Sequence, residues 1–150
     1  MKPCIDPVSV AGSFRDPSGR VYRHGDRIFR TVTNEFSSEF DFVESSGFFQ
    51  MVCKEKLVLS YEHVSPELLV GIGRENKYVL EAPLLPMVSF PYEWSFSALK
   101  EAALLHLKLQ LMALDFEITM SDASAYNVQF HGSCPIFIDH LSFRRYREGE

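Results

Sequence analysis

Three polar residues in the last third of the sequence have the types and spacing of a metal site. Asp122 and Asn127 are five positions apart, and Asp139 follows Asn127 after a further twelve. Their carboxylate and amide oxygens are the ligands that hard cations such as Mg²⁺ prefer. The three residues also suit local roles, with Asp122 capping a turn, Asn127 in a tight loop position and Asp139 capping the segment that follows it. Spacing alone leaves both interpretations open.

A predicted β-hairpin explains how the three side chains could meet. The sequence alternates from Tyr126 to Phe130, turns at His131-Gly132-Ser133 and becomes apolar again from Pro135 to Ile138. Such a pattern is typical of two short antiparallel strands. The open end of the hairpin lies beside Asn127 and Asp139, so we expect both side chains and Asp122 to converge there.

A long helix leads into this segment. We predict it from Phe96 or Ala98 through Leu114, with Ser95 or Ser97 as the N-cap. Its apolar residues recur every three or four positions and form a broad stripe, which predicts a helix buried on most sides: Phe96, Leu99, Ala103, Leu107, Leu111 and Leu114, widened by Ala102, Leu105, Leu109 and Met112. We interpret His106, within this helix, as a core or boundary histidine.

The N-terminal half has the pattern of an antiparallel sheet. Short alternating stretches separated by turns predict strands over 20–22, 27–33, 57–61 and 78–81, with a helical turn over 66–70. The segment from Asn34 to Cys53 has helical periodicity, with Asn34 as N-cap. We therefore predict an α+β fold, in which a sheet of about five strands covered by one helix precedes the long helix and the hairpin.

The order Asp122, Asn127, hairpin, Asp139 resembles the catalytic segment of protein kinases and aminoglycoside phosphotransferases. The resemblance implies that Asp122 orients an acceptor hydroxyl and that Asn127 and Asp139 hold Mg²⁺ with a nucleotide. Met120-Ser121 and His140-Leu141 stand where these families carry other residues. The resemblance also implies a kinase-like N-terminal lobe and an incomplete C-terminal lobe, because about a dozen residues follow Asp139.

In such a lobe a basic residue on the third strand contacts the phosphates and pairs with a glutamate on the helix. No lysine stands at this position, and Arg30 is the available cation, although the two residues are not interchangeable. Glu39 and Glu44 are the candidate partners, with solvated positions on an amphipathic helix as the alternative. The glycines of this region lack the G-x-G-x-x-G spacing of a phosphate-binding loop.

The stretches 121–130, 137–143 and 145–150 look like the N-terminal region of bacterial S-adenosylmethionine-dependent methyltransferases related to nodulation proteins. This second resemblance covers most of the chain. It implies that residues 1–150 are a single kinase-like domain at the N-terminal end of a longer protein. S-adenosylmethionine would bind only in a domain beyond Glu150, so the partner would be that downstream methyltransferase domain or chain, and we expect no methyltransferase activity from these residues alone.

Composition and charge argue against several classes of protein, namely nucleic-acid-binding, membrane-spanning and secreted proteins. A net charge of −5 argues against a nucleic-acid-binding surface, because phosphate contacts require clustered Lys and Arg. The most apolar segment is too short to span a bilayer, and prolines interrupt any N-terminal signal sequence. Three cysteines without metal-site spacing fit a reducing compartment. We expect a cytoplasmic protein that contacts neither nucleic acid nor membrane.

Two functional hypotheses follow. In the first, the chain is a kinase-like, degenerate nucleotide- and Mg²⁺-binding module, with phosphotransferase activity left open. In the second, it is a non-catalytic domain that recruits a substrate or partner for the downstream enzyme. The Asp-Asn-Asp set favours the first hypothesis, whereas the missing lysine and glycine loop favour the second.

Overall fold

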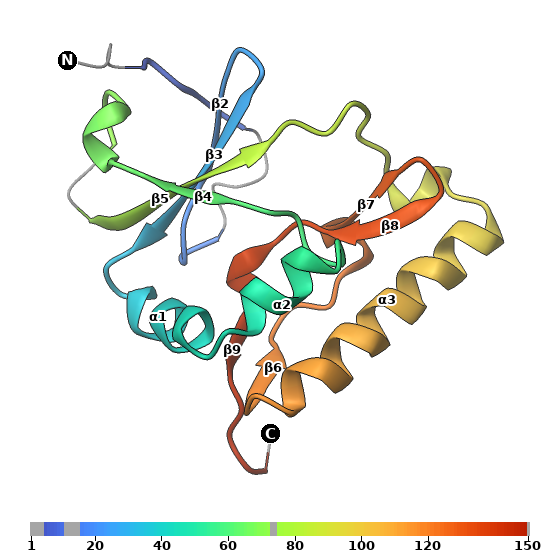
Figure 1. Cartoon of the computed structure of the whole chain (residues 1–150). Helices are drawn as coiled ribbons and strands as arrows, with labels where there is room; N and C mark the ends of the chain where they lie inside the picture. The colour runs from blue at the N-terminus through green and yellow to red at the C-terminus, as the bar shows by residue number, and fades with distance from the viewer. Residues whose placement is uncertain (1–4, 11–15, 73–74, 150) are drawn as a thin grey trace. The chain divides into compact units, whose positions relative to one another are not determined.

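The computed structural model describes residues 5–10, 16–72 and 75–149 of the chain. The chain divides into two compact units (Figure 1). Unit 1 comprises Met1–Phe40 and Tyr61–Leu84, and unit 2 comprises Asp41–Ser60 and Leu85–Glu150. Both units are therefore built from segments that are not adjacent in the sequence.

Unit 1 contains the predicted antiparallel sheet. Its five strands lie in the order β1-β2-β3-β5-β4, and every neighbouring pair is antiparallel. The strands are β1 (Val8–Ser9), β2 (Val21–His24), β3 (Arg27–Thr33), β4 (Glu62–Val64) and β5 (Asn76–Pro83). The turn between β2 and β3 contains Gly25 at φ 58°, a left-handed conformation that glycine adopts readily. The prediction of an antiparallel sheet followed by helices in an α+β fold is confirmed.

The sheet is held by a small apolar core and by one cross-strand ion pair. Ile5, Phe29, Leu69 and Val79 are buried together. The guanidinium of Arg27 donates two hydrogen bonds of 2.6 Å to the carboxylate of Glu81 on β5. Packing and this bidentate pair fix β3 against β5 at the centre of the sheet.

The predicted single helix between Asn34 and Cys53 is wrong in detail, because two helices occupy this segment. They are α1 (Ser37–Ser45) and α2 (Phe48–Lys54). Gly47 separates them at φ 84°, which an α-helix cannot continue through. The carbonyl of Asn34 accepts a hydrogen bond from Ser37 Oγ, and the helix begins at Ser37, two residues later than an N-cap at Asn34 predicts.

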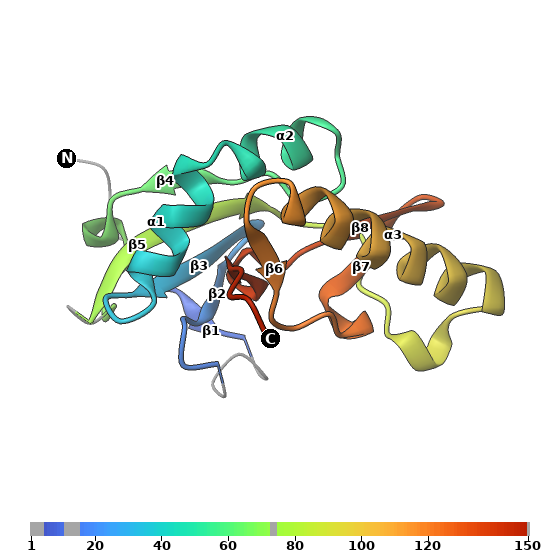
Figure 2. The same cartoon turned by 90° about the horizontal axis from the view of Figure 1, so that it is seen from below.

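Unit 2 contains the long helix, two strand pairs and α2. Helix α3 (Phe96–Leu114) packs against β6 (Ile118–Met120) and β8 (Cys134–Phe137). The predicted hairpin is formed by β7 (Val128–His131) and β8, and Figures 1 and 2 both draw it beside α3. β9 (Phe143–Arg145) pairs with β6, a second strand pair that the sequence analysis does not contain.

Aromatic rings fill the interior of unit 2. Phe143 lies 5.1 Å from Phe48 and 5.4 Å from Phe137 between ring centroids, in edge-to-face arrangements. Both partners of Phe143 are fully buried. Such contacts join α2, β8 and β9 although these elements are far apart in the sequence.

Helix α3 is confirmed, but its burial is one-sided. The buried face consists of Ala102, Leu105, Leu109 and Ala113. The six residues that were predicted as its central stripe are exposed instead: Phe96, Leu99, Ala103, Leu107, Leu111 and Leu114. Because apolar residues occur on most sides of this helix, its periodicity alone cannot predict which face packs against the rest of the unit.

One other segment differs from its prediction. The stretch over 57–61, predicted as a strand, is not a strand in the structure. It pairs with β8 only at Val58, which forms an isolated parallel bridge with Phe137. The amide of Leu59 donates to the carbonyl of Phe137 at 2.8 Å. Arg144 and Arg145 belong to strand β9. In the described part of the chain, no helix is long and apolar enough to cross a membrane.

Candidate functional site

The loop that carries Asp122 starts from a fixed point. In α3, Gln110 Oε1 accepts a hydrogen bond of 2.9 Å from the amide of Met120, and its Nε2 donates to Thr119 Oγ1 at 3.2 Å. The amide of Ser121 donates to the carbonyl of Ser142 at 2.7 Å. The helix and Ser142 therefore position the chain one residue before Asp122.

Ser142 is the residue that joins the predicted site. Its hydroxyl donates to Asp139 Oδ2 at 2.7 Å and accepts from Asn127 Nδ2 at 3.4 Å. The same Asn127 nitrogen lies 3.5 Å from the carbonyl oxygen of Asp122, at the limit of a hydrogen bond. The side chains of Asn127 and Asp139 therefore meet at one buried serine in unit 2, whereas Asp122 contacts Asn127 only through its backbone carbonyl.

Asp139 also has the local capping role considered above. Its Oδ1 accepts a hydrogen bond of 3.2 Å from the amide of Leu141, at the start of the 3-10 turn His140–Ser142. The contacts to Leu141 and Ser142 therefore orient the Asp139 carboxylate within the cluster.

The donor set of the cluster fits Mg²⁺. Asn127 uses its amide nitrogen toward Ser142, which leaves the amide oxygen as the atom able to bind a cation. Among the described residues, no group of three or more His, Cys, Asp or Glu is arranged to hold a metal ion. One or two carboxylates with an amide are what Mg²⁺ uses when phosphate and water supply its other ligands.

Asp122 occupies the solvent-facing edge of the cluster. It is exposed, and its Oδ1 accepts a hydrogen bond of 2.9 Å from the amide of Ser124. This contact stabilises the turn before the 3-10 segment Ala125–Asn127. The other carboxylate oxygen can accept a proton or a hydrogen bond from a hydroxyl group that approaches from solvent.

His106 lies on α3 near Asp122. Its ring packs edge-to-face on Phe137 at 5.6 Å, and Nε2 is buried with no hydrogen-bond partner among the described residues. Burial lowers the pKa of His106, and the charge of Asp122 opposes this by raising it. His106 is half-buried, in agreement with its interpretation as a boundary histidine. Its pKa depends on the charge of Asp122.

Arg30 and Glu39, the residues predicted to contact a cofactor, both lie in unit 1. Arg30 is on β3, where its side chain is largely buried and forms an ion pair with Asp16. Asp16 also accepts a hydrogen bond of 2.8 Å from the amide of Ser18. Glu39 is half-buried in the first turn of α1. A loop carboxylate in its own unit therefore compensates the charge of Arg30.

Sequence reasoning missed two further residues of this region. His140 is 3% exposed, and its Nε2 lies 2.6 Å from the carbonyl oxygen of Leu59. In β7, the buried Gln129 bonds both the amide and the carbonyl of Ser89, at 2.9 and 3.0 Å. Neither partner is close in sequence. The alternation of β7 gives no signal for Gln129, because Val128 and Phe130 are the apolar positions and Gln129 falls on the opposite face of the strand.

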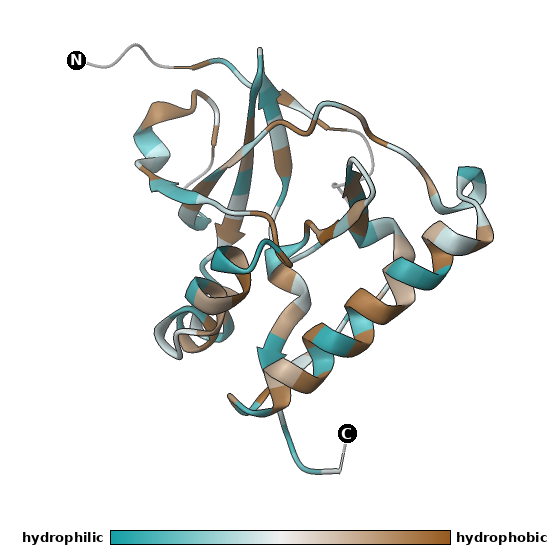
Figure 3. Cartoon of the chain, turned by 45° about the vertical axis from the view of Figure 1, so that its right-hand side comes forward, coloured by the Kyte–Doolittle hydropathy of each residue, from teal (hydrophilic) through white to brown (hydrophobic). Residues whose placement is uncertain are grey.

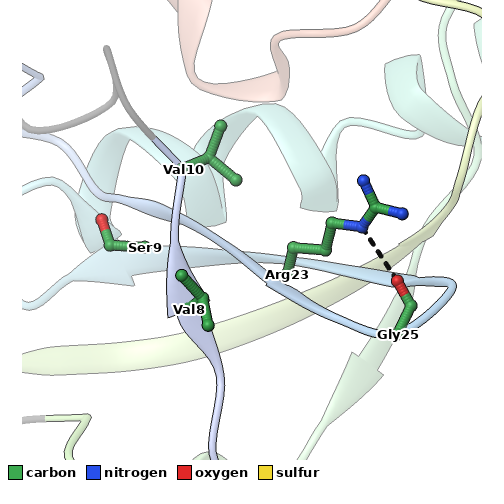
Figure 4. A pocket seen from close by; sticks show the side chains of 5 residues that line it. All are labelled: Val8, Ser9, Val10, Arg23 and Gly25. Carbon is green, nitrogen blue, oxygen red and sulfur yellow. Dashed lines mark hydrogen bonds between the residues drawn. The ribbon is translucent and has the colours of Figure 1, made fainter.

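Two other features have no part in the cluster. Burial raises the pKa of the Cys53 thiol to about 11, which keeps it protonated and unreactive near neutral pH. An open pocket in unit 1 is lined by Val8, Ser9, Val10, Arg23 and Gly25 (Figure 4). Arg23 Nε donates to the carbonyl of Gly25 at 2.9 Å within the turn, so this nitrogen already has a partner.

Comparison with known proteins gives a related sequence and related structures. The chain is 45% identical over 144 residues to the nodulation protein NoeA of Rhizobium meliloti (strain 1021). The match covers 96% of this chain and 30% of NoeA. The structure of vaccinia related kinase 3 aligns with a TM-score of 0.56 at 12% identity, over 95% of this chain and 49% of that one. No protein-family model matches the sequence.

These comparisons support the kinase-like fold and the relation to a nodulation protein. At 12% identity the structural similarity shows the fold alone. The chain spans less than a third of the length of NoeA, so the identity concerns one part of that protein. The predicted connection with S-adenosylmethionine-dependent methyltransferases stays a prediction.

Proposed function

We propose that this chain is a kinase-like module that binds a nucleotide together with Mg²⁺, with Asn127 and Asp139 as the metal-binding residues. The observation that carries the proposal is the cluster around Ser142, which holds Asp139 at 2.7 Å and Asn127 at 3.4 Å from one hydroxyl. In phosphoryl transfer, most of the catalytic effect comes from positioning the reactants and neutralising the charge of the phosphate. Bound Mg²⁺ would neutralise phosphate charge at this cluster, while the exposed carboxylate of Asp122 accepts the hydrogen bond of an acceptor hydroxyl and orients it.

Calorimetric titration of ATP into the 150-residue protein, with and without Mg²⁺, tests the proposal. We expect binding only with Mg²⁺, and at least about a tenfold loss of affinity in Asp139→Asn, because a metal-binding charge is lost. Asparagine still accepts the hydrogen bond from Leu141 and therefore preserves the cap. Asp122→Asn should bind ATP as the wild type does and lose only transfer, if transfer occurs.

A control variant outside the cluster separates the loss of a metal-binding charge from a general effect of protein charge on ATP binding. Asp115 is exposed at the end of α3, so Asp115→Asn removes the same charge outside the cluster and should leave binding unchanged. If the wild type does not bind ATP, or Asp139→Asn binds it equally well, the metal assignment is wrong.

The second candidate function is a non-catalytic domain that recruits a substrate or partner. The pairing of Arg30 with Asp16 favours it, because an arginine neutralised within its own unit is a poor substitute for a phosphate-binding lysine. NoeA has 70% of its length outside the match, which is where a methyltransferase domain with its S-adenosylmethionine would lie. This candidate predicts calorimetric binding of the chain to that remaining part of NoeA, and no binding of S-adenosylmethionine to the chain alone.

A further inference from the structure

One face of α3 carries a row of exposed apolar side chains. The exposed fractions are 82% for Phe96, 63% for Leu107 and 68% for Leu111, and Leu99 and Leu114 are also exposed. Strongly hydrophobic segments recur along α3 in Figure 3. The helix extends for about 28 Å. Isolated exposed leucines are ordinary, but a continuous apolar row of this length is typical of a protein interface.

We propose that this face binds a second copy of the chain, with the two α3 helices packed antiparallel about a two-fold axis. The row runs from Phe96 through Leu99, Ala103, Leu107 and Leu111 to Leu114, with intervals of three, four, four, four and three residues. The intervals read the same from both ends. An interface between identical copies requires a surface that complements itself, and this symmetry provides one.

The antiparallel arrangement also places side chains of suitable size opposite one another. Phe96 lies opposite Leu114 of the second copy, and Leu99 lies opposite its Leu111. At the centre, the small Ala103 lies opposite Leu107, which lets the two helices approach closely on both sides of the axis. Alternation of small and large residues allows facing layers to interdigitate.

Charge selects the antiparallel direction. Lys100 lies near the start of α3, Asp115 directly follows its end, and both are exposed. In the antiparallel pair, each Lys100 lies about 8 Å along the axis from Asp115 of the other copy, within reach of a lysine side chain. A parallel pair in register would instead place Lys100 beside Lys100 and Asp115 beside Asp115, which is unfavourable.

Sedimentation velocity across the micromolar range tests the association. We expect a reversible dimer of the wild-type chain and a monomer for Leu107→Asp, because the substitution places a charge at the centre of the interface. The matched control is Val70→Asp, which introduces the same charge at an apolar residue of unit 1 that is 51% exposed, and it should leave the dimer intact.

Cysteine cross-linking tests the direction. In a background with Cys4 and Cys134 replaced by serine, Leu99→Cys and Leu111→Cys should form an intermolecular disulfide when the two variants are mixed and oxidised. Neither variant alone should cross-link, because each position faces the other one in an antiparallel pair. Cross-linking of either variant with itself would contradict the arrangement.

A wild-type monomer throughout the micromolar range, or a dimer that Leu107→Asp leaves intact, would overturn the proposal. A monomer would assign the face to other polypeptide, such as the part of NoeA outside the match. The result is independent of nucleotide binding, because none of the interface residues belongs to the cluster around Ser142. Leu107→Asp should therefore bind ATP and Mg²⁺ as the wild type does.

Discussion

At the scale of single residues, the site consists of predicted and unpredicted parts. The types and spacing of Asp122, Asn127 and Asp139 predict three converging side chains, and in the structure those of Asn127 and Asp139 share the hydroxyl of Ser142. Ser142 was missed, because a serine three residues beyond Asp139 has many local uses and no motif separates them. A pattern of spaced residues can identify groups capable of chemistry, but the hydroxyl that orients them depends on the path of the chain.

The first prediction at this scale concerns His106. Nuclear magnetic resonance titration should give His106 a pKa below its ordinary value of 6.5, because burial disfavours the imidazolium form. Asp122→Asn should lower it further, since the carboxylate opposes this shift. A folded-state pKa below the unfolded one means that His106 adds stability above pH 6.5, and that this contribution is lost as the pH falls through the unfolded value toward the folded one. An unchanged His106 pKa in Asp122→Asn would contradict the coupling.

The second prediction concerns His140. His140→Ala should lower the free energy of unfolding by about 2–4 kcal/mol, because it leaves the Leu59 carbonyl with only the Cys53 thiol as a partner and opens a cavity beside Phe49. His131 is exposed at the hairpin turn, and His131→Ala should change stability by less than about 0.5 kcal/mol. Chemical denaturation of the two variants gives the comparison, and equal effects would show that His140 has no special structural role.

At the scale of elements, the sequence predicts the existence of most helices and strands better than their partners. The sequence predicts helix α3 from Phe96 or Ala98 through Leu114, and of its two candidate N-caps Ser95 is the one that accepts a hydrogen bond from Ala98. Its packed face was not predicted, because apolar residues surround the helix. The pairing of β6 with β9 joins segments separated by the whole hairpin, and neither strand exceeds three residues. Local patterns carry little information about such a distant pair.

The break between α1 and α2 gives a prediction at this scale. Gly47 adopts φ 84°, and a Cβ atom there would meet no atom within 4 Å. Gly47→Ala should therefore destabilise the protein by about 1–2 kcal/mol through backbone strain alone. Gly47→Asn should cost less, because asparagine tolerates the left-handed conformation. Thermal denaturation should rank wild type, Asn and Ala in that order, and an alanine variant as stable as the wild type would exclude strain.

At the scale of the whole molecule, each unit is assembled from two separate stretches of sequence. Unit 2 needs residues 41–60 as well as 85–150, since Phe48 from α2 packs on Phe143 and Val58 pairs with Phe137. The sequence predicts a single kinase-like domain over residues 1–150 and no such division. Contacts between distant segments define a compact unit, and composition along the chain does not reveal them.

A pair of fragments tests this division. The fragment 85–150 should lack a cooperative unfolding transition, whereas 41–150 should retain one, because it contains every segment of unit 2. Trp94 is the only tryptophan and packs on Phe130 within this unit, so near-ultraviolet circular dichroism reports its native environment. A native Trp94 signal from 85–150 alone would show that α2 and the segment after it are dispensable.

The contacts beside the β6–β9 pair determine where extra residues can be inserted into this chain. Ser121 donates to the Ser142 carbonyl through both its amide and its hydroxyl, so the loop carrying the site is closed at its base. The tip of the β7–β8 hairpin, from His131 to Cys134, is exposed at the opposite end. Lengthening a loop whose ends are fixed costs little conformational entropy. The hairpin tip is therefore the position at which an epitope tag or a fluorescent label can be inserted without displacing Asn127 or Asp139.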